Sequence, residues 1–454
     1  MADFIDFCSN EEKIKVAIVG SGPAGFYTAD NILKSTENCE IDIFEQFPCP
    51  FGLIRFGVAP DHEKTRGVWR AFSKTAQNKA VQYFGNIQVG TDISIDELLK
   101  NYDAAVIAIG AGKDRPLTLA GSNLPGVFGS ASFVNWYNSH PESANLNPNL
   151  NTDSVVIIGA GNVAIDVARV LLKTPSEMSN TDLATHASKV IHSAPIQDIY
   201  LVARRSAAEA KFTNVELREM GQLEQAEPRV DAGSLPDIVE AEMSDRDRRI
   251  REKNIETLRD FSRRSPGEKP KRLHFIFCAQ PLEIIGNNKV ERVIFEHTKI
   301  ENGKATGTGK KFDIECGAVI AATGYRSEPL PGAPFDDERG VIPNDSGRVA
   351  TGLYVAGWVK RGPSGVIGTN KIDARETVDL MLKDIGVGKN KPGRAAINLL
   401  LSERGCRAVN YSAWNKIQQA EEDAAVGDAP RAKFVNVEDM MSILDNNSIP
   451  DSDV

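Results

Sequence analysis

Two glycine-rich segments, one in the first third of the chain and one in the second, restrict the fold more than any other feature. The first, residues 20–25, reads GSGPAG, and the second, residues 159–164, reads GAGNVA. Each follows a short apolar run and precedes a helix-like run, the order found in a dinucleotide-binding β-α-β unit. The glycines of such a unit allow a tight turn and bring the backbone close to a pyrophosphate at the helix N-terminus. We therefore expect an α/β protein with two Rossmann-like dinucleotide-binding domains.

The first unit has the complete pattern. Residues 14–19 form an apolar, β-branched run, residues 26–33 favour a helix, and the next strand ends at Glu45. Glu45 follows Gly25 by 20 residues, the spacing at which a carboxylate binds a ribose 2′-hydroxyl. This unit is predicted to hold a dinucleotide with a free ribose. The residues expected to approach it are Gly20, Gly22, Ala24, Gly25 and Glu45.

The second unit favours a phosphorylated cofactor. A strand over 155–158 and a helix over 163–172 flank its glycines, and the next strand leads to Arg204 and Arg205 rather than to an acid. Guanidinium groups bind a 2′-phosphate bidentately, which predicts NADP(H), although a solvated arginine pair is the alternative. The polar stretch 173–197 is interpreted as a surface insertion. The residues expected at this site are Gly159, Ala160, Gly161, Asn162, Val163, Arg204 and Arg205.

Composition excludes several other classes of protein. A net charge of −9 over 454 residues argues against general nucleic-acid binding. The six cysteines form no C-x-x-C pair and the six histidines form no ligand cluster, so neither a metal site nor a dithiol site is predicted. No apolar run approaches the ~18 residues that cross a bilayer, and the acidic N-terminus is unlike a targeting peptide. We expect a cytoplasmic monomer without a membrane span; a removed organellar leader is the open alternative.

Several longer blocks point to one known family. They read PFGLIRFGVAPDH (50–62), LPGVFGSASFVNWYN (124–138), GAGNVAIDVAR (159–169), FTNVELREM (212–220) and GWVKRGPSGVIG (357–368). In these blocks the chain resembles the adrenodoxin reductase family of NADPH–ferredoxin reductases, to about residue 420. The resemblance implies an FAD domain made of residues 1–113 and 324–454, with the NADP domain, residues 114–323, inserted between its parts.

The resemblance also implies the reaction and further site residues. NADPH gives a hydride to flavin N5, and single electrons then pass to a ferredoxin-type iron–sulfur protein. If a helix starts at Gly365, its N–H groups would stabilise the reduced flavin; a glycine-rich turn followed by an unrelated helix is the alternative. His62 and Asp166 are candidates for proton handling, with a purely structural role as the alternative. The further contacts implied are Leu53, Val89, Trp358, Gly365, Val366 and Ile367 for FAD, and Glu216 and Gly365 for NADP.

A basic stretch on this acidic chain suggests a docking surface. Residues 246–272 hold eleven Lys or Arg and five Asp or Glu, and ferredoxins of this type are acidic, so a basic face would steer one. A solvated helix face is the alternative for this stretch. For the whole chain, the alternatives are a flavin enzyme acting on a small organic acceptor and a non-enzymatic nucleotide-binding redox sensor. The docking candidates are Arg248, Arg249, Arg251, Lys360 and Arg361, the Lys-Arg pair being predicted to face outward.

Overall fold

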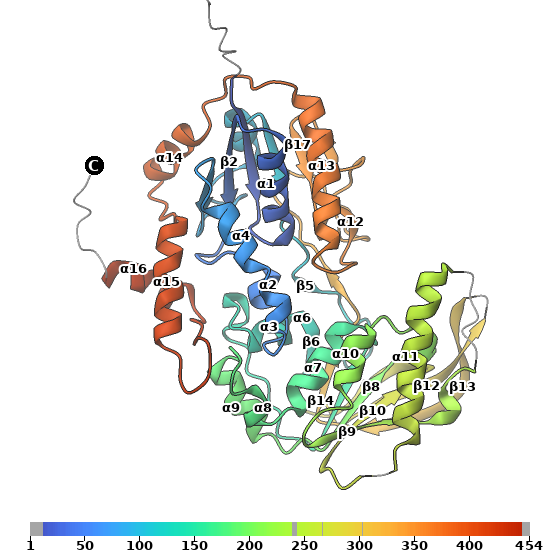
Figure 1. Cartoon of the computed structure of the whole chain (residues 1–454). Coiled ribbons are helices and arrows are strands. Elements are labelled where there is room, and N and C mark those ends of the chain that lie inside the picture. Colours follow the sequence, from blue (N-terminus) through green and yellow to red (C-terminus); the bar gives the residue numbers. More distant parts are fainter. Residues whose placement is uncertain (1–11, 238–242, 266, 302, 447–454) are drawn as a thin grey trace, which may run out of the picture.

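Two parallel β-sheets, one in each half of the molecule, organise the fold. The computed structural model describes residues 12–237, 243–265, 267–301 and 303–446; Cys8 and the acidic start of the chain lie outside these ranges. The two helix-covered sheets lie one above the other in Figure 1. The prediction of an α/β fold with two Rossmann-like units is confirmed.

The first sheet has the strand order β16-β17-β4-β1-β2-β3 and is parallel except for β16. Alternate residues of β1 face opposite sides: Val16 and Ile18 pack toward α1 and α13, whereas Ala17 and Val19 pack toward α5 and α14. Both faces are therefore buried, as expected for parallel strands. The elements are β1 (Ile14–Val19), α1 (Pro23–Ser35), β2 (Cys39–Phe44), β3 (Val81–Phe84), α5 (Ile95–Asn101), β4 (Ala104–Ile107), β16 (Arg348–Ala350), β17 (Leu353–Val355), α13 (Thr369–Ile385) and α14 (Arg394–Glu403).

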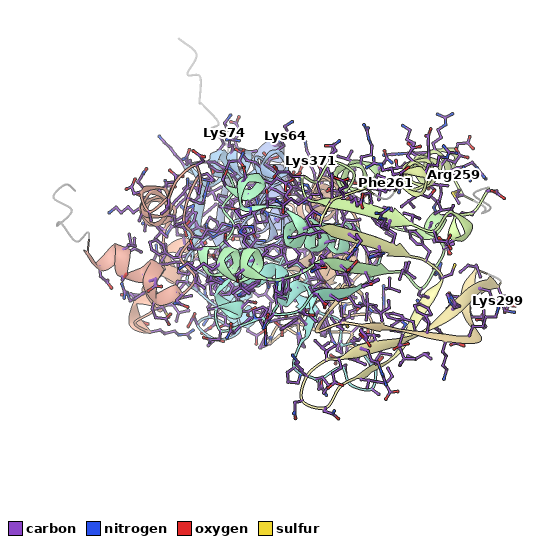
Figure 2. The ribbon with its side chains drawn as sticks, turned by 90° about the horizontal axis from the view of Figure 1, so that it is seen from below. Lys64, Lys74, Arg259, Phe261, Lys299 and Lys371 are labelled. Carbon is purple, nitrogen blue, oxygen red and sulfur yellow. The ribbon has the colours of Figure 1, made fainter. Side chains whose placement is uncertain are left out.

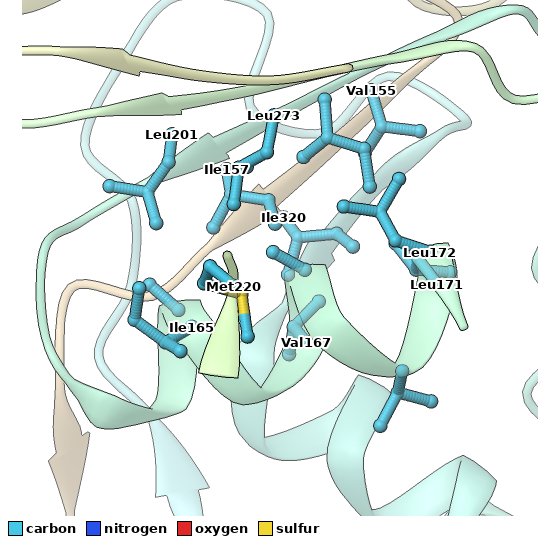
Figure 3. Packing of buried hydrophobic residues seen from close by; sticks show 14 of the residues in the cluster. Val155, Ile157, Ile165, Val167, Leu171, Leu172, Leu201, Met220, Leu273 and Ile320 are labelled. Atoms are coloured by element: carbon cyan, nitrogen blue, oxygen red, sulfur yellow. The ribbon is translucent and has the colours of Figure 1, made fainter. Parts of the chain in front are cut away.

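The second sheet has the order β6-β14-β7-β8-β10-β9, and all its neighbouring strands are parallel. Figure 3 shows its core, in which Val155, Ile157, Leu201, Leu273 and Ile320 from the strands meet Ile165, Val167 and Leu171 of α7. The elements are β6 (Val127–Gly129), β7 (Ser154–Ile158), α7 (Asn162–Leu172), β8 (Asp198–Val202), β9 (Ala226–Val230), β10 (Lys271–Ile276) and β14 (Ala318–Ala321).

The stretch 173–197 belongs to this core, so its interpretation as a surface insertion is wrong. It forms α8 (Pro175–Met178) and α9 (Thr185–Ser193). Met178, Ala187 and Ile191 are buried among the same apolar side chains as α7. The apolar residues are few, but they all face inward, which a scan of overall polarity does not reveal.

Two smaller sheets flank the second half. β11 (Ala279–Ile285), β12 (Arg292–Glu301) and β13 (Lys304–Glu315) form an antiparallel sheet. β5 (Lys113–Asp114) pairs with β15 (Tyr325–Arg326), and the chain crosses between the halves on this pair. Residues 113 and 114 form β5, and β15 begins at Tyr325; the domain boundaries expected at 113/114 and 323/324 stay a prediction.

The C-terminal segment packs on the first half and reaches the second. Trp414 and Ile417 of α15 are buried against the first sheet's helices, and the segment 424–436 runs down toward α9 (Figure 1). Within the described ranges, every helix is too short or too polar to cross a membrane. The remaining helices are α2 (Leu53–Phe56), α3 (Glu63–Arg66), α4 (Trp69–Ala76), α6 (Ser130–Tyr137), α10 (Asn214–Glu219), α11 (Asp245–Arg263), α12 (Trp358–Arg361), α15 (Tyr411–Asp423) and α16 (Val437–Asn446).

Candidate functional site

The first glycine loop joins β1 to α1 at the carboxyl end of the first sheet. Gly20 has a φ of +107°, and a Cβ there would lie 2.6 Å from the carbonyl oxygen of Ala108. A Cβ on Gly25 would lie 2.0 Å from the carbonyl oxygen of Gly20, so neither position accepts a side chain. A Cβ on Gly22 would meet nothing within 4 Å. The backbone at Gly22 is therefore open to a ligand in front of the N-terminus of α1, as a pyrophosphate requires.

Glu45 follows β2 and faces this loop. Its Oε2 accepts hydrogen bonds from the Ser21 backbone N–H at 3.1 Å and from the Ser21 hydroxyl at 2.6 Å. Burial raises the pKa of the Glu45 carboxyl, and the hydrogen bonds from Ser21 lower it. Glu45 therefore contacts the first glycine loop through Ser21, and its binding of a ribose stays a prediction. Of the other predicted FAD contacts, Leu53 begins α2 and Val89 is buried in the first half.

The second glycine loop repeats this geometry between β7 and α7. Gly159 has a φ of +141°, and a Cβ there would lie 2.3 Å from the carbonyl oxygen of Ala322. A Cβ on Gly161 would again meet nothing within 4 Å. Asn162 begins α7, and its Oδ1 accepts a hydrogen bond from the backbone N–H of Thr213 at 2.7 Å. This bond ties the loop to the segment leading into α10.

Arg204 and Arg205 follow β8 and are both exposed. Arg205 donates to Glu209 at 2.7 Å. Arg204 makes no ion pair with any residue that the structure describes. Arg204 is therefore free to receive a phosphate, whereas Arg205 would have to exchange a carboxylate for it.

The segment after β17 forms a turn and not the start of a long helix. Gly365 has a φ of +82°, and the Thr369 hydroxyl accepts a hydrogen bond from the Val366 N–H at 3.2 Å. The expectation that a helix begins at Gly365 is wrong, because this left-handed backbone cannot continue into α13, which begins at Thr369. The Trp358 indole N–H donates to the Ser364 carbonyl at 3.1 Å and fixes the turn from its other side.

Asp373 of α13 holds this turn and was missed in the sequence. It is 7% exposed and accepts a hydrogen bond from the backbone N–H of Gly357. Its Oδ1 lies 3.0 Å from the Lys360 Nζ, and Arg361 lies 3.9 Å from its Oδ2. The prediction that Lys360 faces outward is wrong, because its side chain is only 10% exposed. The only sign of this role in the sequence is that Asp373 follows the glycine-rich segment ending at Gly368, inside a run expected to be helical.

A charged cluster joins the two halves. His62, from the first half, places its Nε2 at 3.1 Å from Glu219 and 3.2 Å from Glu216, both on α10. Its Nδ1 lies 3.9 Å from Asp166 of α7. The structure therefore brings together His62, Asp166 and Glu216, which the sequence analysis had assigned separately, and adds Glu219.

Buried Arg169 lies at the centre of this cluster. Its guanidinium bonds Asp61 of the first half at 2.6 and 3.0 Å, and lies 2.8 Å from Asp166 on its own helix. The arginine also lies 3.5 Å from Glu216 and from Glu219. Asp61 and Arg169 were missed in the sequence, although both lie inside blocks that carry the resemblance.

The environment shifts several pKa values in the cluster. Burial lowers the pKa of His62, but the hydrogen bond with Glu219 and the nearby carboxylates leave it raised. Burial raises the pKa of Glu216, whereas the His62 hydrogen bond lowers that of Glu219. Burial alone would raise the pKa of Asp61, but Arg169 and Lys173 hold it well below its usual range.

One atom each of His62, Glu216 and Glu219 lie within 4.8 Å of one another, a spacing that metal ligands can have. Arg169 already supplies a positive charge 3.5 Å from both carboxylates. A metal ion would have to overcome that charge, so the arrangement favours an ion-pair network over a metal centre.

Residues 246–263 of the basic stretch lie in helix α11, whose inner face is apolar, and Lys271 and Arg272 begin β10. Ile255, Leu258 and Phe261 are buried against the second sheet, so the arginines lie on the outer face. Arg249 is exposed, and Arg248 and Arg251 are partly exposed. Figure 2 shows Lys64, Lys74 and Lys371 of the first half along the same side of the molecule as Arg259 of α11.

Comparison with known proteins gives the family. The pyridine nucleotide-disulphide oxidoreductase family model matches residues 14–220. The mitochondrial NADPH:adrenodoxin oxidoreductase of Arabidopsis thaliana is 39% identical over 96% of this chain and 97% of its own length. The chain belongs to the adrenodoxin reductase family. The human adrenodoxin oxidoreductase is 39% identical over 96% of this chain and 93% of its own.

A solved structure of the same family agrees over nearly the whole fold. FprA of Mycobacterium tuberculosis, in complex with NADPH, has a TM-score of 0.91 and 36% identity, and covers 95% of this chain and 99% of that chain. The adrenodoxin reductase resemblance, the split two-domain fold and the assignment as an enzyme, all predicted from the motifs, are confirmed.

Proposed function

We propose that the chain is an NADPH–ferredoxin reductase that holds FAD in its first half and NADP(H) in its second. Family membership over 96% of the chain is the observation that carries this proposal. The two glycine loops support it, because each places an open glycine before a helix N-terminus. In this proposal residues 1–113 and 324–454 bind FAD, and residues 114–323 bind NADP(H).

The residues of the first half position the flavin. Flavin, when bound, supplies the chemistry, because it accepts a hydride and releases electrons singly. Glu45 binds the ribose, and Asp373 fixes the turn that brings Trp358 over the site and excludes water. Trp358 stands where many flavoproteins have an acid, and Asp373 supplies the missing carboxylate to this corner. The FAD contacts proposed are Gly20, Gly22, Ala24, Gly25, Glu45, Leu53, Val89, Trp358, Gly365, Val366 and Ile367.

The residues of the second half select NADPH. Arg204, exposed and without an ion pair among the described residues, binds the 2′-phosphate first, and Arg205 joins it by releasing Glu209. The left-handed turn at Gly365 brings the backbone to both cofactors. The NADP contacts proposed are Gly159, Ala160, Gly161, Asn162, Val163, Arg204, Arg205, Glu216 and Gly365.

His62 and Asp166 hold protons where the two halves meet. The raised pKa of His62 keeps its ring charged closer to neutral pH than a free imidazole, and its Nε2 is shared by Glu216 and Glu219. This network orients Glu216 toward the NADP site. It also ties α10 to the first half, which holds the two cofactor sites in register.

The outer face of α11 docks the acidic partner. Positive charge on this face comes from Arg248, Arg249 and Arg251. Partly exposed Arg361 extends that charge next to the Gly365 turn. Lys360 is not part of the proposed docking surface, because its side chain is buried against Asp373. A monomer leaves this face open.

Five cysteines are free among the described residues, which fits a reducing compartment such as the cytoplasm.

One mixing experiment tests the proposal. The FAD-loaded protein is mixed anaerobically with NADPH and an acidic [2Fe–2S] ferredoxin, while flavin and ferredoxin absorbance are followed. We expect flavin bleaching by NADPH and then ferredoxin reduction, so that each NADPH reduces a pair of ferredoxins. Reduction of small quinones but not of ferredoxin would indicate a small-acceptor enzyme. Nucleotide binding without NADPH oxidation would indicate a sensor.

A further inference from the structure

The segment that follows β8 borders the proposed NADP site along its whole length. It leaves the second sheet at the arginine pair and then returns to the second glycine loop, where the Lys211 N–H donates to the Ala160 carbonyl at 2.7 Å. Glu209 lies between these two points of attachment. Its position relative to the glycine loop is therefore set from both ends of the segment.

Packing fixes the turn that carries Glu209. Residues Ala207–Glu209 form a single helical turn, and Ala207 is buried in the core of the second half. Oε2 of Glu209 lies 3.4 Å from the Ser206 backbone nitrogen, in a capping arrangement that holds the carboxylate against the start of the turn. The Glu209 side chain is only 18% exposed. Glu209 is therefore an ordered acid at the edge of a proposed phosphate site.

The other carboxylate oxygen of Glu209 pairs with Arg205. Oε1 of Glu209 lies 2.7 Å from Nη1 of Arg205. A guanidinium binds a phosphate through the same charge-assisted N–H donors that it offers to a carboxylate. A 2′-phosphate that reaches Arg205 therefore meets a positive charge that Glu209 already neutralises, and the two anions compete for it.

The pair is weak enough to be exchanged and strong enough to change an affinity. Arg205 is 46% exposed, so solvent screens the pair, and such ion pairs shift an equilibrium by up to about fivefold. A phosphate with a charge of about −1.5 to −2 attracts the guanidinium more strongly than one carboxylate does. Exchange should therefore weaken the binding of a 2′-phosphorylated nucleotide without preventing it. NAD(H) has a hydroxyl at this position and does not need Arg205.

We propose that Glu209 is a specificity-determining residue of the NADP site: by holding Arg205, it limits the preference for a 2′-phosphorylated nucleotide. This inference rests on the proposed function, which places the 2′-phosphate at the arginine pair. NADPH and NADP+ carry the same 2′-phosphate, so Glu209 weakens the binding of both by the same factor. It therefore speeds release of the oxidised nucleotide at the cost of a higher KM for NADPH.

Calorimetric titration of the FAD-loaded full chain with NADP+ and with NAD+ tests the proposal. Glu209→Gln keeps the size of the side chain and can still cap the turn. We expect it to bind NADP+ about three- to tenfold more tightly than the wild type does, with the NAD+ affinity unchanged. Asp260→Asn, which removes the same charge from an exposed ion pair on α11, is the matched control and should change neither affinity. Retained flavin absorbance shows that each variant folds, and Glu209→Ala carries the same expectation.

An Arg205→Ala background separates exchange from simple repulsion between Glu209 and the phosphate. If Glu209 acts by holding Arg205, Glu209→Gln should tighten NADP+ binding at least about twofold more with Arg205 present than without it. Equal gains in the two backgrounds would overturn the proposal, as would an unchanged NADP+ affinity in folded Glu209→Gln or an equal gain for NAD+. A wild type that binds NADP+ no more tightly than NAD+ would instead contradict the NADP site of the proposed function.

Discussion

Asp373 Oδ1 lies 3.0 Å from the Nζ of Lys360, so a helix of the first half holds the turn that carries Trp358. The same carboxylate accepts a hydrogen bond from the Gly357 N–H. A buried acid thus fixes the backbone at the end of β17 and neutralises a lysine that would otherwise be buried alone.

Replacing Asp373 should weaken FAD binding. Asp373→Asn leaves Lys360 buried without a counter-charge, and the turn should loosen. We expect about a tenfold loss in FAD affinity, since a hydrogen bond to a charged group contributes ~1.5–3 kcal/mol. Titration of apoprotein with FAD measures it. Asp379→Asn, on the exposed side of the same helix, is the control. Unchanged affinity in a folded Asp373→Asn protein would contradict this role.

The arginine pair after β8 should decide the choice of nicotinamide cofactor. In the double variant Arg204→Ala/Arg205→Ala we expect kcat/KM for NADPH to fall by about 100-fold or more, because two charge-assisted bonds to the 2′-phosphate are lost. The value for NADH should change little. Steady-state rates with ferricyanide as acceptor measure both, and Arg292→Ala, another exposed arginine, is the control. Equal losses for the two cofactors would mean that the pair is structural.

Charge reversal on α11 should affect ferredoxin and spare small acceptors. Arg248→Glu/Arg249→Glu/Arg251→Glu is expected to raise the KM for ferredoxin at least ~10-fold and to flatten its dependence on ionic strength. NADPH–ferricyanide activity should persist. The control is a triple variant with the same charge change at three exposed lysines of the first half, Lys79→Glu/Lys383→Glu/Lys416→Glu. Identical ferredoxin kinetics in both triple variants would remove α11 from the docking surface.

The pair of Asp61 and Arg169 should make stability fall in acid. The pKa of Asp61 is held below its usual range in the folded state. Its contribution is therefore complete above the unfolded value of ~3.9 and is lost as the pH falls through the lower folded value. Asp61→Asn should cost ~1.5–3 kcal/mol at neutral pH, because the buried Arg169 guanidinium loses its charged hydrogen-bond partner and keeps only the more distant or single contacts with Asp166, Glu216 and Glu219.

Thermal unfolding of the FAD-loaded protein between pH 3 and pH 7 measures this effect. The variant should melt lower than the wild type at pH 7 and show a shallower decline on acidification. Asp260→Asn, at an exposed pair on α11 whose partner atom lies 3.8 Å away, should cost less than ~1 kcal/mol. Parallel curves for Asp61→Asn and the wild type would show that Asp61 does not titrate as described.

The fold was predictable because its strongest signals are local. In the glycine loops, strand, turn and helix lie within some twenty residues, and the glycines are required by close contacts such as that of Gly25 with the Gly20 carbonyl. Glu45 and Arg204 lie at the ends of the following strands, where the β-α-β pattern places ligand contacts. The split of the first half into two sequence segments was predicted from the blocks that resemble the adrenodoxin reductase family.

The charged contacts between distant segments were not predictable from the sequence. Asp61 and Arg169 are 108 positions apart, and Arg55 and Glu421 are 366 apart. No periodicity relates such residues, because the fold alone brings them together. Lys360 shows the same limit: a lysine in a glycine-rich segment favours exposure, yet an aspartate on the next helix buries it. The residues 173–197 were misinterpreted because few of them face the core.

The position of β17 in the first sheet sets an order of folding. The second sheet is complete once β14 has been synthesised, so that half can fold while the chain is still leaving the ribosome. The first sheet must wait, because β17 pairs with β4 and follows β14 in the chain. During that interval the edge of β4 that later pairs with β17 is apolar and unpaired. The first half is therefore the part of the nascent chain in which an apolar strand edge waits longest for its partner.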